Sequence, residues 1–64
     1  MKRLDLLAYL RKHGCVFTKE GARHSLYVNP AIGRFSTVPR HTEIDSFLAR
    51  KICKDLGIPK IDKR

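Results

Sequence analysis

Histidine is the side chain in this sequence best suited to acid–base chemistry, because imidazole exchanges a proton near neutral pH. The chain has three histidines, His13, His24 and His41. His13 falls at the end of an expected helix and is most simply a cap there. His41 either bonds the start of the next expected helix or contacts a substrate phosphate beside it. His24 either fills a strand or is a catalytic group, and the residues alone leave both interpretations open.

The neighbours of His24 could bind phosphate. Arg23 could neutralise it, and Ser25 and Tyr27 offer hydroxyl groups on the same strand face as Arg23. Because successive strand residues point to opposite faces, His24 points away from all three unless a β-bulge near Gly21 redirects a side chain. A single phosphate site built from this segment therefore requires such a bulge.

The other polar residues match no metal or cofactor site. The histidines and cysteines show no paired ligand spacing, and the acidic residues are scattered singly. Neither a glycine-rich phosphate loop nor a Ser-His-Asp set can be placed, so we expect no metal and no cofactor. RNA cleavage needs only one histidine and positive charge, because the 2′-hydroxyl supplies an internal nucleophile. DNA lacks this hydroxyl and would hardly be cut.

Length and charge restrict the class of protein. A chain of 64 residues buries only about 60% of the surface that it exposes when unfolded, which excludes a dinucleotide-binding domain, a barrel or a deep enclosed pocket. The 14 lysines and arginines against six acidic residues give a net charge of +8. This excess favours a polyanionic partner: nucleic acid, an acidic protein or an anionic membrane surface. A hydrophobic content of 42% predicts a folded chain.

The sequence predicts a cytoplasmic protein that does not insert into a membrane. No apolar run approaches the roughly 20 residues that cross a bilayer. Charged residues interrupt the N-terminal segment, which therefore does not resemble a signal peptide. Cys15 and Cys53 are expected to be free thiols, because a small secreted domain would carry more disulfides.

The histidines are expected to be positioned by two helices and three short strands. Leu4, Leu7, Ala8 and Leu10 show helical spacing, which predicts a helix over residues 3–13 that Gly14 closes. Residues rich in β-formers predict strands at 15–19, 23–28 and 34–38, separated by turn residues. Three short strands joined by short turns indicate an antiparallel meander.

The second helix is expected to start at a capping box formed by Thr42, Glu43 and Asp45. Gly57 ends it. Its apolar face is expected to consist of Ile44, Phe47, Leu48, Ile52 and Leu56.

The predicted fold is therefore α+β, with the order α-β-β-β-α and both helices on one face of a three-stranded antiparallel sheet. One domain covers residues 1–64, with 58–64 as a frayed tail. The covered sheet face is expected to carry Val16 or Phe17, Leu26 or Val28, and Phe35.

Several segments of the chain, in this order, resemble the HicA toxins. They are Gly21 to Tyr27, Asn29-Pro30, Val38 to His41, and Leu48 to Gly57. The resemblance covers about residues 3–58. It implies an mRNA interferase with a fold like a double-stranded-RNA-binding domain, and a HicB-type antitoxin that blocks it. The family's single active-site histidine matches His24, in His24-Ser25-Leu26-Tyr27.

The resulting hypothesis is a toxin that cleaves mRNA without metal, with His24 as general base or acid. The residues expected to hold the RNA are Lys19, Arg23, Ser25, Tyr27, Arg34, Arg40 and His41. The alternative is a non-catalytic RNA-binding module of the same fold, which the charge supports equally well. The acidic start of the second helix disfavours plain duplex binding. Three strands between the helices argue against a helix-turn-helix DNA regulator.

Overall fold

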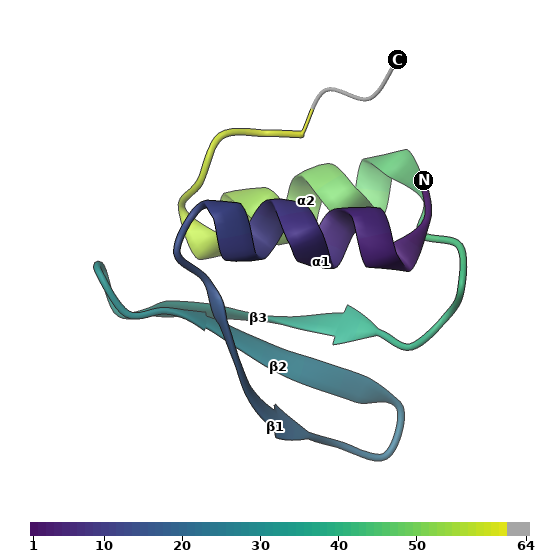
Figure 1. Cartoon of the computed structure of the whole chain (residues 1–64), viewed down its shortest axis with the longest axis horizontal. Coiled ribbons are helices and arrows are strands. Elements are labelled where there is room, and N and C mark those ends of the chain that lie inside the picture. The colour runs from purple at the N-terminus through teal and green to yellow at the C-terminus, as the bar shows by residue number, and fades with distance from the viewer. Residues whose placement is uncertain (62–64) are drawn as a thin grey trace.

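The computed structural model describes residues 1–61 and contains two helices and three strands (Figure 1). In chain order they are α1 (Arg3–Lys12), β1 (Val16–Glu20), β2 (His24–Asn29), β3 (Arg34–Pro39) and α2 (Ser46–Leu56). The strands form one antiparallel sheet in the order β1-β2-β3. Both helices cover one face of this sheet, which confirms the predicted α+β fold (Figure 1). No helix within the described residues is long and apolar enough to cross a bilayer.

The two helices run side by side in the same direction (Figure 1). Where they start, the backbone N–H of Ile44 donates to the carbonyl of Met1 at 2.7 Å. Where they end, the hydroxyl of Tyr9 donates to the carbonyl of Pro59 at 2.8 Å. These contacts join segments more than 40 residues apart and hold α1 and α2 together at both ends.

The core lies between the helix pair and the covered sheet face. Its buried apolar residues are Leu6, Leu7, Leu10, Cys15, Tyr27, Val38, Ile44, Ala49, Ile52, Cys53 and Leu56. Two expectations for α1 were wrong, because Leu4 and Ala8 are exposed and Leu6 is buried instead. In α2 the expected apolar face holds for Ile52 and Leu56, whereas Phe47 points to solvent.

The register of the strands reverses the expected facing of several residues. Leu26 pairs with Thr37 and Val28 with Phe35, and all four side chains lie on the uncovered face. The prediction that Phe35 enters the core was wrong, since its side chain is 66% exposed. The covered face carries Tyr27 and Val38 with the buried polar residues Ser25, Asn29 and Ser36. A shift of one residue in register moves every side chain of a strand to the other face, which explains the error.

The start of α2 also differs from the expectation. Asp45, not Thr42, is the N-cap, and its carboxylate accepts from the backbone N–H groups of Phe47 and Leu48 at 3.0 and 3.3 Å. Glu43 forms an isolated antiparallel bridge with Lys2. Pairing with the N-terminal segment therefore keeps Glu43 and Ile44 out of the helix, which starts about one turn later than expected.

Asp45→Ala is expected to lower the free energy of unfolding by about 1 kcal/mol, because two helix N–H groups lose their acceptor. Thr42→Ala is the matched control and should change stability by less than about 0.5 kcal/mol. Urea unfolding followed by circular dichroism measures both. Equal effects of the two substitutions would contradict the assignment of Asp45 as the cap.

The two cysteines are free thiols in the core, as predicted. Burial raises the pKa of both the Cys15 and the Cys53 thiol, and the proximity of Cys53 adds to the shift at Cys15. Both therefore resist conversion to the thiolate, the form that reacts.

We expect the folded protein to react with a disulfide reagent at pH 8 about tenfold or more slowly than the unfolded chain, because reaction requires local opening. Absorbance of the released thiolate, with and without denaturant, measures the two rates. Equal rates would show that at least one thiol is accessible in the folded state.

The chain after α2 turns back at Gly57, whose φ of 69° is the left-handed conformation that ends many helices. Ile58 and Ile61 then pack, partly buried, against the core. The rest of the segment expected as a tail, residues 62–64, lies outside the described residues.

Candidate active site

His24 is the first residue of β2 and is exposed. It pairs with Pro39, the last residue of β3, and its carbonyl accepts from the N–H of Gly21 at 2.7 Å. The β1–β2 turn and the neighbouring strand thus fix its backbone. Its side chain shares the uncovered sheet face with Leu26, because residues two apart in a strand point the same way.

Antiparallel pairing brings the residues before His24 next to those that follow β3. Arg23, His24, Arg40 and His41 all contribute to one open hollow at this end of the sheet, together with Ala22 and Pro39. Three of the seven residues expected to hold RNA therefore gather around the candidate catalytic histidine. These residues come from the start of β2 and the end of β3, which lie some 15 residues apart in sequence. The local sequence around His24 therefore could not reveal the arrangement.

Lys19 extends this positive surface along β1. Lys19 pairs with Leu26, which places its side chain on the uncovered face. The next pair toward His24 joins Glu20 and Ser25. The sheet does contain a bulge, but it lies between Phe17 and Lys19 rather than near Gly21. The bulge puts Lys19 on the face of His24, and it leaves the alternation in β2 unchanged.

The remaining three residues are not part of this surface. Ser25 and Tyr27 lie on the covered face and are buried, as strand alternation requires once His24 faces outward. Arg34 begins β3, so the length of the strand separates it from Pro39 by about 17 Å. Arg34 is exposed, but at the opposite end of the sheet from His24.

A chain of polar contacts fixes the strand ends beneath the hollow. Arg3, at the start of α1, donates from Nε to the Pro39 carbonyl at 2.9 Å and from Nη2 to Ser25 Oγ at 2.8 Å. Ser25 Oγ donates to Glu20 Oε1 at 2.9 Å, and Glu20 Oε2 binds Nε of Arg40 at 2.8 Å. These contacts connect α1, all three strands and the segment that follows β3.

In this network Ser25 binds other side chains of the fold, and the ion pair with Glu20 holds Arg40 beside the hollow. The Arg40 side chain is 55% exposed and lines the hollow with His24, so its guanidinium suits a phosphate there. Arg3 was not among the residues that the sequence indicated as functional. Its partners lie 22 and 36 positions away, and no local signal marks such a contact.

Among the described residues, no three His, Cys, Asp or Glu side chains gather in a way that could hold a metal ion. Arg23 makes no hydrogen bond or ion pair within residues 1–61, so its guanidinium is available for a ligand. The hollow thus combines two imidazoles with two guanidinium groups, a set that can bind a phosphodiester and transfer a proton beside it.

Comparison with known proteins identifies one family. A family model described as "HicA toxin of bacterial toxin-antitoxin" matches residues 4–58. The matched segment begins in α1 and ends just beyond α2, so it includes every element of the fold and the whole hollow around His24. No curated protein and no solved structure matches the chain.

Proposed function

The chain belongs to the HicA family of toxins from toxin–antitoxin systems, and from this premise we propose that it is a metal-independent endoribonuclease that cleaves mRNA. The observation that carries the proposal is the exposed His24 at the end of the sheet, flanked by Arg23, Arg40 and His41 in one hollow. An open hollow suits a long substrate that passes over the surface better than a small molecule, which would need enclosure.

The proposed reaction uses the RNA's own 2′-hydroxyl. Its oxygen forms a bond to the adjacent phosphorus, the bond from phosphorus to the 5′-oxygen breaks, and a 2′,3′-cyclic phosphate results. One proton leaves the 2′-hydroxyl and one must reach the departing 5′-oxygen. His24 acts as the general base in the first transfer or as the general acid in the second, which accelerates the reaction by about 10²–10⁴-fold.

The cationic residues stabilise the negative charge that develops on the phosphate. Arg23 and Arg40 approach it from the two strand ends, and His41 binds beside them. Lys19 contacts the RNA backbone farther along the uncovered face. Ser25 and Tyr27 act through the fold, because both are buried beneath this face. Arg34 contacts only RNA that extends across the whole sheet.

The family membership implies an antitoxin partner, and we propose that it is of the HicB type. A protein with a net charge of +8 attracts an acidic partner over a distance, which speeds association. The proposed substrate, mRNA, places this activity in the cytoplasm.

The experiment that tests the proposal is incubation of the purified protein with RNA in excess EDTA, followed by mass spectrometry of the fragment ends. We expect cleavage that leaves 2′,3′-cyclic phosphates or their hydrolysis products. Fragments with only 3′-hydroxyl ends would overturn the mechanism. Binding of RNA without any cleavage would favour the non-catalytic RNA-binding module instead.

A further inference from the structure

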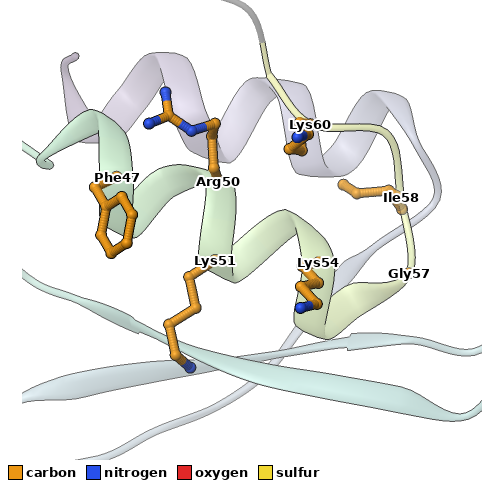
Figure 2. Close-up of a pocket in the computed structure, with 7 residues that line it drawn as sticks. All are labelled: Phe47, Arg50, Lys51, Lys54, Gly57, Ile58 and Lys60. Carbon is orange, nitrogen blue, oxygen red and sulfur yellow. The ribbon is translucent and has the colours of Figure 1, made fainter.

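The outer side of α2 carries a second hollow that has no part in the proposed reaction. Phe47 precedes Arg50 and Lys51 by three and four residues, and Lys54 follows them by four and three, so all four lie on one side of the helix. The chain that turns back after α2 adds Ile58 and Lys60, as Figure 2 shows. The buried residues of α2 face the opposite way, into the core.

Part of this surface is apolar. The Phe47 side chain is 73% exposed, although it lies on a helix whose other large apolar residues are buried or half-buried. The Arg50 guanidinium lies 6.0 Å from the centroid of the Phe47 ring. Ile58 lies half-buried at the far end of the hollow. The stems of the lysine side chains add further apolar surface between these two residues. The hollow therefore has an apolar floor, with Phe47 at one end and Ile58 at the other.

The rim of the same surface is positively charged. Arg50, Lys51, Lys54 and Lys60 are four of its seven lining residues, and none of the seven is acidic. Within residues 1–61, Lys51 is the one of these four that forms an ion pair, with Asp55 at 3.1 Å. The surface therefore combines an apolar floor with an excess of positive charge.

This hollow shares no residue with the one around His24. It belongs to the helix layer, which covers one face of the sheet (Figure 1). The side chain of His24 lies on the other face, as the alternation along β2 requires. A ligand of the α2 hollow would therefore leave the proposed catalytic residues accessible, unless it also reached around the molecule.

We propose that the α2 hollow docks an acidic segment of the antitoxin, one that also carries apolar side chains. This inference rests on the proposed function, which makes the antitoxin the partner. Carboxylates of such a segment would pair with Arg50, Lys54 and Lys60, and its apolar side chains would cover Phe47 and Ile58. RNA would pair its phosphates with the cations and stack a base on Phe47, but it has no aliphatic group to cover Ile58. The aliphatic side chain in the hollow thus favours a protein segment over RNA.

The test compares two double variants that change the charge equally. Arg50→Glu/Lys54→Glu alters the hollow, and Arg11→Glu/Lys12→Glu alters exposed positions at the end of α1. The affinity of each for a purified HicB-type antitoxin is measured by calorimetry at fixed salt. We expect the first variant to bind about tenfold or more weakly than the parent, and the second to stay within about threefold.

Phe47→Ser provides a variant that keeps every charge. It should also weaken antitoxin binding, and it should not unfold the protein, because the ring is exposed. RNA cleavage by the free α2 variants should equal that of the parent.

Unchanged antitoxin affinity in both α2 variants, or an equal loss in the α1 control, would overturn the proposal. Loss of RNA binding with normal antitoxin binding would also overturn it and would assign the hollow to RNA. Absence of cleavage by the parent would refute only the proposed function, since the affinities are measured without RNA.

Discussion

His24→Ala is expected to lower the rate of RNA cleavage by about 10²–10⁴-fold, the usual contribution of a general acid or base. Alanine cannot accept the proton of the 2′-hydroxyl or donate one to the leaving 5′-oxygen. The cations around the hollow remain in place, so RNA should bind the variant nearly as well as the parent. Single-turnover cleavage at saturating protein measures the chemical step apart from binding.

Two further substitutions distinguish catalysis from damage to the fold. His13→Ala removes an imidazole at the far end of α1, next to the Tyr9 ring, and should leave cleavage unchanged. His41→Ala removes a proposed phosphate contact and should weaken RNA binding more than it slows the chemical step. His24 is exposed, so its substitution should alter stability by less than about 0.5 kcal/mol. A folded His24→Ala variant that cleaves at the parent rate would refute the assignment.

Arg3→Ala is expected to lower the free energy of unfolding by about 2–4 kcal/mol, because two charge-assisted hydrogen bonds are lost. The Pro39 carbonyl and Ser25 Oγ would each lose the guanidinium donor that binds them. A domain of this size has a total stability of only about 3–10 kcal/mol, so the loss is a large fraction of it. Urea unfolding followed by circular dichroism measures the change.

Arg11→Ala removes an exposed arginine from the same helix and should change stability by less than about 0.5 kcal/mol. Arg3→Lys keeps the charge, but a single ammonium group cannot reproduce the fork that reaches two acceptors, so it should restore only part of the loss. Equal effects of Arg3→Ala and Arg11→Ala would show that the network contributes nothing to stability.

The elements of this fold were predictable because their signals are local. Gly14 and Gly57 both adopt positive φ where the helices were expected to end. Strand facing was not predictable in the same way. β1 is exposed along its whole length, so its apolar residues Val16 and Phe17 gave no guide to register. The bulge before Lys19 shifts the pairing further, and it depends on contacts with β2 that no short segment encodes.

The candidate site was predictable only in part, for a related reason. The resemblance to a known family indicated His24, and the excess of basic residues indicated an anionic ligand. The grouping of Arg23 with Arg40 and His41 depends on strand pairing, which joins residues distant in sequence. Ser25 and Tyr27 looked equally suitable for phosphate until the register placed them in the interior. The contribution of Arg3 depends entirely on tertiary structure.

The most direct test of the proposed mechanism is cleavage of an RNA oligonucleotide with one 2′-deoxynucleotide at a mapped cleavage position. We predict that the protein, in excess EDTA, cuts the all-RNA oligonucleotide there and leaves the substituted linkage intact, because the internal nucleophile is missing. Cleavage at other mapped positions in the same oligonucleotide should continue and shows that the RNA still binds. Equal cleavage of the substituted linkage would mean that water or another external nucleophile attacks the phosphate, and it would contradict the mechanism proposed for His24.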